Sequence, residues 1–137
     1  MKTTYEIISM IGLLVLSATF TASAQLANTA WEGVFMIPDA EKCVLNFKND
    51  TIYLKAYDEV LSDSDFDNFI FETALYTISN DTLTMQKVSG GSPCALDAVG
   101  KYHFEINDEG LLLTAIQDPC PERIDGISQN RLKKVEY

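Results

Sequence analysis

Three cysteines and one histidine are the side chains of this sequence best suited to chemistry. Cys94 and Cys120 are flanked by prolines, which places both in loops. Cys43 lies in an alternating, strand-like run and is expected to be a buried, inert thiol. We therefore predict a disulfide between Cys94 and Cys120 and one free cysteine, in a protein that folds in an oxidising compartment.

The single histidine, His103, shares one face of a predicted strand with Lys101 and Glu105 and is expected to face solvent. A zinc site built from His103 and the three cysteines would have suitable ligand types. It lacks a paired Cys-x-x-Cys spacing, however, and the disulfide would consume two ligands. A Gly-x-Ser-x-Gly nucleophile turn does not occur in the sequence either. We therefore predict no metal, no cofactor and no enzymatic activity.

Acidic and turn-forming residues offer two further candidate sites. Asp63, Asp65 and Asp67 alternate as calcium ligands do, but an EF-hand would need glycine and glutamate where the chain has Asn68 and Ala74. We therefore expect a solvated acidic loop there. The tripeptides at 49–51 and 80–82, both Asn-Asp-Thr, match the signal for N-glycosylation and are equally typical of a turn that leads into a strand.

The first 24 residues have the features of a secretory signal peptide. Lys2 precedes an apolar run of about ten residues, and Ala22-Ser23-Ala24 suits cleavage before Gln25. A membrane-spanning helix would need about twenty apolar residues. We therefore predict a mature chain of residues 25–137 that forms one domain, is secreted or periplasmic, and does not span the membrane.

Composition excludes other classes of protein. The formal net charge of −10 would repel a phosphate backbone, which argues against nucleic-acid binding. A hydrophobic content of 47 %, with 10 % aromatic residues, is too high for a disordered chain.

Eight segments have the alternation of β-strands, with short polar turns between most of them. They are residues 31–37, 42–48, 51–57, 69–78, 82–88, 101–106, 111–117 and 131–137. Such a series favours antiparallel hairpins in a meander barrel or sandwich. One short helix is predicted within residues 121–128, with Asp118 as its N-cap, Pro119 as its first residue and Gly126 as its end.

Several motifs resemble those of the small secreted lipocalin-like proteins of bacteria. They are Trp31-Glu32-Gly33, Gly100-Lys101-Tyr102-His103-Phe104 after a cysteine, the Leu-x-Leu strand at 111–113, and Asp118-Pro119-Cys120-Pro121-Glu122-Arg123. The resemblance implies an all-β calycin fold, an eight-stranded antiparallel meander β-barrel with one short helix before the last strand. It also implies the Cys94–Cys120 bridge. Relatives often have an aromatic residue near Arg131, where this chain has Leu132.

In lipocalin-type barrels, a first-strand tryptophan plugs the closed end beneath an arginine. The resemblance therefore implies a cation–π contact of Trp31 with Arg131 or Arg123. The alternative is a tryptophan that only packs in the core.

The resemblance leaves two functions open. One is the binding of a small apolar ligand at the barrel mouth or interior, for which the candidate residues are Phe35, Phe47, Leu54, Phe71, Met85, Tyr102 and Phe104. The other is a protein-interaction or inhibitor module that acts through loops at the barrel end. The expected inward-facing set also includes Trp31, Leu45, Leu75, Leu83 and Leu113. Because so many large side chains leave little space in an eight-stranded barrel, a ligand is expected to be small and near the open end.

Overall fold

The computed structural model describes residues 25–36, 39–57, 70–128 and 130–136. The expected leader (1–24) and acidic loop (62–68) lie outside these residues. The elements are β1 (Thr29–Met36), β2 (Ala40–Lys48), β3 (Thr51–Ala56), β4 (Ile70–Ser79), β5 (Thr82–Gly90), β6 (Val99–Asn107), β7 (Gly110–Gln117), α2 (Pro121–Ile127) and β8 (Lys133–Val135).

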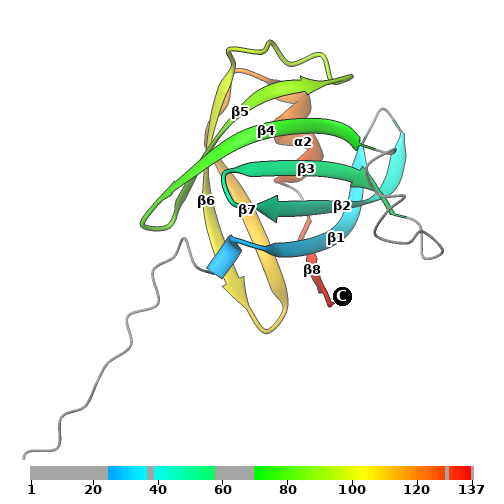
Figure 1. The fold of residues 1–137 in the computed structure, drawn as a ribbon, viewed down its shortest axis with the longest axis vertical. Helices are drawn as coiled ribbons and strands as arrows, with labels where there is room; N and C mark the ends of the chain where they lie inside the picture. The colour runs from blue at the N-terminus through cyan, green and yellow to red at the C-terminus, as the bar shows by residue number, and fades with distance from the viewer. Residues whose placement is uncertain (1–24, 37–38, 58–69, 129, 137) are drawn as a thin grey trace, which may run out of the picture.

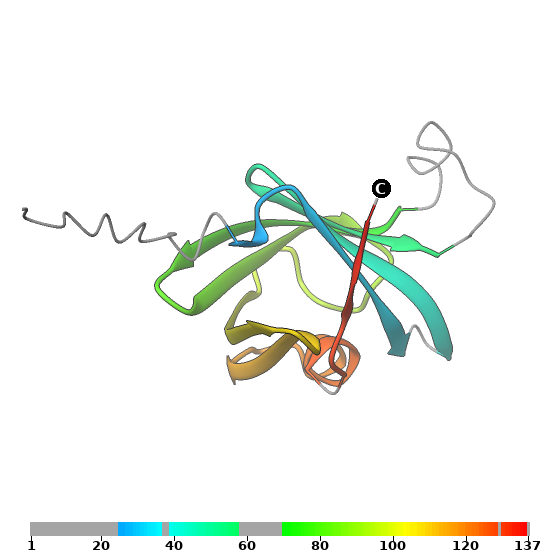
Figure 2. The ribbon, with the colours of Figure 1, turned by 90° about the horizontal axis from the view of Figure 1, so that it is seen from below.

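The eight strands form one antiparallel sheet in the order β7-β6-β5-β4-β3-β2-β1-β8. From β1 to β7, each strand pairs with the next along the chain, and the sheet curves into a nearly closed barrel (Figure 1). Strand β8 returns to pair with β1. Figure 2 shows α2 end-on, beside the β6–β7 hairpin and the start of β8. The prediction of an all-β meander barrel with one short helix before its last strand is confirmed.

The barrel closes through a single residue pair. Leu111 at the start of β7 and Leu132 just before β8 exchange two backbone hydrogen bonds, of 2.9 and 2.8 Å. Gly110 permits this approach, because a side chain there would collide with the carbonyl oxygen of Leu132. Its φ of +126° is also a conformation that favours glycine.

The two Asn-Asp-Thr segments form the turns of the β2–β3 and β4–β5 hairpins, as the turn interpretation predicts. Asn80 adopts the left-handed conformation (φ 54°), which asparagine tolerates better than most residues. Each threonine hydroxyl donates to the preceding aspartate, from Thr51 to Asp50 at 2.9 Å and from Thr82 to Asp81 at 3.4 Å.

Most strands bury alternate residues, whereas β2 buries five consecutive residues, from Cys43 to Phe47. On β6, Tyr102 and Phe104 are buried while Lys101 and Glu105 are exposed, as their alternation predicts. Most other members of the expected inward set are buried or partly buried, namely Trp31, Phe35, Leu45, Phe47, Leu54, Leu83, Met85 and Leu113.

The prediction that Leu75 faces inward is wrong, since its side chain is 48 % exposed. The pairing of β4 shifts register twice, against β3 between Leu54 and Lys55 and against β5 between Thr73 and Ala74. After these irregularities, Ala74 and Tyr76 are the buried residues of β4. A shift of one residue moves a side chain to the opposite face of a sheet.

The predicted helix forms, but its ends differ from the expectation. Cys120 is the N-cap and Pro121 is the first residue of α2. Proline suits the first helical position, because the N–H that proline lacks has no partner within the helix there. Asp118 instead accepts the Cys120 N–H at 2.9 Å. Gly126 is buried inside the helix, which ends at Ile127.

Candidate functional site

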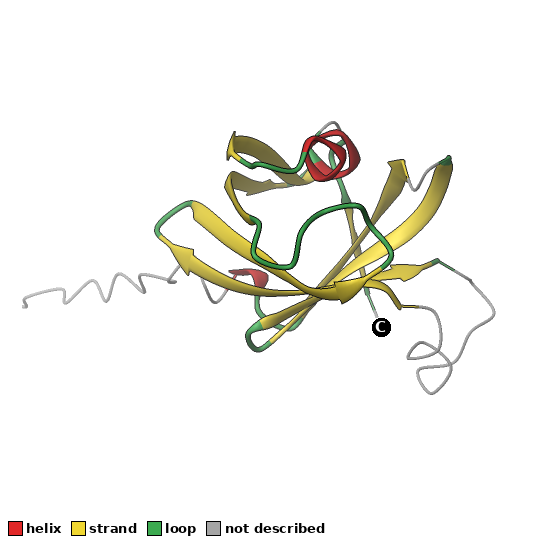
Figure 3. Cartoon of the chain, turned by 90° about the horizontal axis from the view of Figure 1, so that it is seen from above, coloured by secondary structure: helices red, strands yellow, loops and turns green. Residues whose placement is uncertain are grey.

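A cavity of about 620 Å³ lies between the barrel interior and α2. Its strand-side walls are mostly apolar and come from Phe35, Met36, Leu45, Ile52, Leu54, Phe71, Ala74 and Met85. Residues 91–94 and α2 complete the lining. Figure 3 shows α2 end-on, with the long β5–β6 loop arching beside it across the space that the strands enclose. Cavities of about 300–1,000 Å³ with apolar walls are typical of small-molecule sites.

Polar groups line the cavity only where the β5–β6 loop and α2 meet the barrel. They belong to Glu72 of β4, Ser92 of the loop, and Glu122 and Arg123 of α2. The site therefore has a long apolar part and one polar end.

Lys87 fixes the loop that forms this polar end. Its buried ammonium donates to the Ser92 carbonyl at 2.7 Å, to the Ser92 hydroxyl at 3.2 Å and to the Cys94 carbonyl at 3.2 Å. Glu72 Oε2 lies 4.0 Å from the same nitrogen. Because each bond has a charged donor, the loop is held firmly against β5.

A second buried cluster fixes α2. Arg123 donates from Nε to Asp118 Oδ2 at 2.6 Å and from Nη2 to Asp118 Oδ1 at 2.8 Å, a bidentate pair. Nη2 also donates to the Ala98 carbonyl at 3.1 Å, and the Tyr102 hydroxyl donates to Asp118 Oδ2. Gly100 makes room, because a Cβ at this position would collide with the Asp118 carboxylate.

The cluster sets the protonation of its members. Burial alone would raise the pKa of Asp118, but hydrogen bonds from Arg123, Tyr102 and the Cys120 N–H outweigh burial and hold that pKa below its ordinary value. Burial and the bond to Asp118 raise the pKa of Tyr102. Asp118 is thus ionised and Tyr102 neutral at physiological pH, which suits a structural cluster.

One atom of the cluster has no partner. Arg123 Nη1 is buried and makes no hydrogen bond among the described residues. Because this nitrogen has almost no accessible surface, it is closed off from the cavity that other atoms of Arg123 line.

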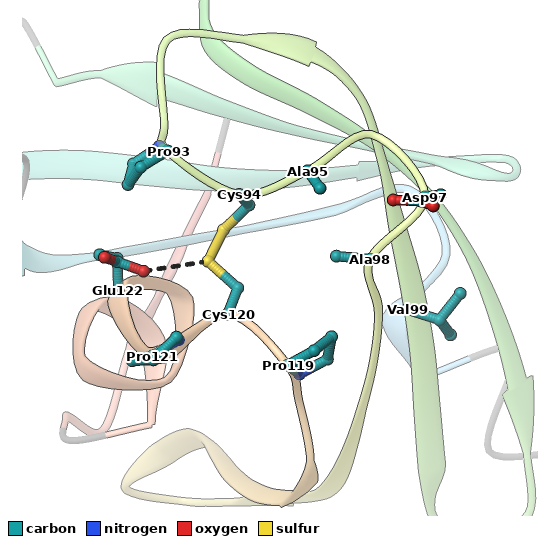
Figure 4. Close-up of a pocket in the computed structure, with 10 residues that line it drawn as sticks. All are labelled: Pro93, Cys94, Ala95, Asp97, Ala98, Val99, Pro119, Cys120, Pro121 and Glu122. Atoms are coloured by element: carbon teal, nitrogen blue, oxygen red, sulfur yellow. Dashed lines mark hydrogen bonds between the residues drawn. A yellow bond between two sulfur atoms is a disulfide. The ribbon is translucent and has the colours of Figure 1, made fainter.

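The predicted Cys94–Cys120 disulfide is confirmed, with a Cα–Cα distance of 5.4 Å. It joins the β5–β6 loop to the start of α2. A groove of about 480 Å³ lies on its outer side, between Pro93, Val99 and Glu122 (Figure 4). Cys94, Pro93 and Glu122 line both the groove and the barrel cavity, so the disulfide belongs to the wall between them.

Cys43 is free and buried, as predicted. Burial, aided by the nearby charge of Glu41, raises the pKa of its thiol to about 11. His103 lies on the outer face of β6, where Nδ1 is 3.3 Å from Asp81 Oδ2. Among the described residues, no three histidine, cysteine or acidic side chains gather as a metal site requires.

The candidate ligand-binding residues divide into two groups. Phe35, Leu54, Phe71 and Met85 line the cavity, but Phe71 is 36 % exposed and is not buried in the barrel as predicted. Phe47, Tyr102 and Phe104 pack in the core and are not part of its lining. The polar end of the cavity was not predicted from the sequence. Lys87, Ser92 and Glu72 come together through the shifted pairing of β4 with β5, which the sequence does not reveal.

Trp31 is packed in the core, 2 % exposed, and its indole N–H donates to the Thr29 hydroxyl at 2.8 Å. The expected cation–π contact of the Trp31 ring with an arginine is not found. The cation–π contacts of the described residues are those of Lys42 over Tyr57 and Lys55 over Tyr53. Both arginines have other partners: Arg123 pairs with Asp118, and Arg131 lies against acidic side chains of the β6–β7 hairpin.

Comparison of the chain with protein-family models, with curated proteins and with solved structures finds no match. The part of the chain described contains no helix that is long and apolar enough to cross a membrane.

Proposed function

We propose that this protein is an exported, lipocalin-like barrel that binds a small, largely apolar ligand in the cavity beside α2. The observation that carries the proposal is the cavity itself: about 620 Å³, apolar along the strands and polar at one end. Burial of apolar ligand surface there would supply about 25 cal/mol per Å² removed from water, before the costs of association. The disulfide supports export, because such bonds persist in oxidising compartments.

The walls of the cavity support binding rather than a collapsed interior. Lys87 and the disulfide hold the loop, and Asp118 holds α2 through Arg123. Such fixed walls keep a site pre-organised, which reduces the ordering cost that a ligand would otherwise meet.

Two substitutions on β4 test the proposal. Ala74→Phe places a ring in the cavity, whereas Thr77→Phe places the same ring on an exposed position of the same strand. We expect the wild type and Thr77→Phe to bind the apolar fluorophore N-phenyl-1-naphthylamine equally well in a titration. Ala74→Phe should bind it at least about tenfold more weakly, a difference of roughly 1.4 kcal/mol.

The result also decides against the alternative function. If the wild type takes up no apolar probe, or if both variants bind as the wild type does, the cavity is not a ligand site. An interaction module that acts through barrel-end loops would then be the better interpretation.

A further inference from the structure

Glu72 is a charged residue on the inward face of the barrel. It pairs with Leu54 of β3 and shares one face of β4 with Ala74 and Tyr76, because side chains on one face of a strand recur at every second residue. Tyr76 and Ala74 are buried, and Ala74 and Leu54 line the cavity together with Glu72. The strand therefore directs a carboxylate toward the interior of an otherwise apolar wall.

The Glu72 carboxylate is open to the space of the cavity. Its side chain is 14 % exposed, and neither oxygen accepts a hydrogen bond from the described residues. Within that part of the chain, Arg123 Nη1 is the one side-chain nitrogen or oxygen that is both closed off and without a partner. The oxygens of Glu72 are thus unbonded and accessible, unlike the Arg123 nitrogen.

The cation nearest to Glu72 leaves it able to accept a hydrogen bond. Lys87 Nζ lies 4.0 Å from Glu72 Oε2, which is beyond hydrogen-bond distance. An ammonium has three N–H donors, and Lys87 makes its three hydrogen bonds to the Ser92 carbonyl, the Ser92 hydroxyl and the Cys94 carbonyl. A half-buried carboxylate without a donor is costly, so a ligand that brings an N–H to Glu72 gains binding energy that a hydrocarbon lacks.

The charges around this end of the cavity favour a cation over an anion. Arg123 is paired with Asp118. Lys87 is paired with Glu72, which leaves the Glu122 carboxylate of the cavity wall in excess. The whole chain has a formal net charge of −10. An anionic head group would lose hydration here and find no unpaired cation among the described residues of the lining, whereas an ammonium would be attracted.

We propose that the ligand is an amphiphilic amine, namely an apolar body that ends in a protonated primary amine. This inference rests on the proposed function and specifies its ligand class. The apolar body lies along the strand-side wall, and the ammonium donates to Glu72 in a charge-assisted hydrogen bond. Because that bond needs an N–H, a quaternary ammonium of the same charge fits the site less well.

Four ligands with the same ten-carbon chain test the head group. They are decylamine, decyltrimethylammonium, decanol and decanoate, each used to displace N-phenyl-1-naphthylamine at pH 7.5 and below its critical micelle concentration. At this pH the amine is protonated and the carboxylate is ionised. We expect decylamine to bind about fivefold or more tighter than decanol, and at least about tenfold tighter than decyltrimethylammonium and decanoate.

Two variants assign the preference to a residue. Glu72→Gln removes the negative charge with little change of shape, so the affinity for decylamine should fall close to that for decanol, which itself should change less than about twofold. Glu105→Gln makes the same change on the exposed outer face of β6 and should leave all four affinities unchanged. If Glu72→Gln does not fold, the wild-type ranking of decylamine against decyltrimethylammonium still decides.

The possible failures are distinct. If neither the probe nor any of the four ligands binds, the proposed function falls. If decanol, decanoate or decyltrimethylammonium binds as tightly as decylamine, apolar binding stands and the amine is refuted. The same holds if Glu72→Gln weakens decylamine no more than Glu105→Gln does.

Discussion

Asp118→Asn is the substitution that should destabilise this protein most specifically. The side chain is fully buried and accepts hydrogen bonds from Arg123, Tyr102 and the Cys120 N–H. Asparagine fits the space, but it leaves the guanidinium without a counter-charge and turns an N–H₂ group toward donors. Removing one partner of a buried ion pair costs about 3–5 kcal/mol.

That cost is large relative to the whole stability, which is about 5–15 kcal/mol for a native domain. At roughly 4 °C per kcal/mol for a domain of this size, the melting temperature should fall by about 12–20 °C. Urea unfolding measures the loss directly, because the single tryptophan, Trp31, is buried in the core and reports unfolding by fluorescence. Asp108→Asn, on an exposed turn, should change stability by less than about 0.5 kcal/mol.

The pH dependence provides a second measurement. The pKa of Asp118 is lowered in the folded protein, so the carboxylate stabilises the fold above the unfolded-state pKa of about 3.9. This contribution is lost as the pH falls through the lower, folded-state pKa. The difference between the wild type and Asp118→Asn should therefore narrow in acid. A variant that unfolds within 1 kcal/mol of the wild type at pH 7, on the order of an exposed pair, would refute the assigned role of the cluster.

Two further substitution experiments test the barrel and its cysteines. Phe104→Ala should cost about 3–5 kcal/mol as a large core truncation, whereas His103→Ala, on the outer face, should cost less than about 1 kcal/mol in urea unfolding; equal small effects would contradict the assigned faces of β6. Peptide mapping without reductant should show Cys94 joined to Cys120, and iodoacetamide should modify Cys43 only after unfolding, because its thiol is buried and has a pKa of about 11; rapid modification of the native protein would contradict this.

Local patterns were sufficient to predict the strands and the disulfide. The alternation of Tyr102 and Phe104 with polar residues gave the faces of β6 correctly, and the Asn-Asp pairs marked two hairpin turns. The proline-flanked positions of Cys94 and Cys120 separated them from Cys43. Each of these features depends on a few neighbouring residues, which a single sequence contains.

The cavity could not be predicted, because it depends on contacts between distant segments. The irregular register of β4 turned Leu75 outward and brought Ala74 into the wall. Whether Arg123 would face Trp31 or Asp118 depended on where α2 docks. An inventory of large inward side chains also suggested a filled interior, since it could not show how far α2 and the loop stand from the strands.

The Leu111–Leu132 pair is the weakest junction between neighbouring segments of the barrel, because only two backbone hydrogen bonds join them. Seven strand pairings join the eight strands from β7 to β8, whereas two backbone hydrogen bonds close the barrel between β7 and Leu132. Separating this pair leaves those seven pairings intact but uncovers the buried side chains of Leu111 and Leu132, so it costs less free energy than global unfolding. Because α2 precedes Leu132 in the chain and lines the cavity, an opening at this pair would let the proposed ligand exchange without unfolding of the barrel.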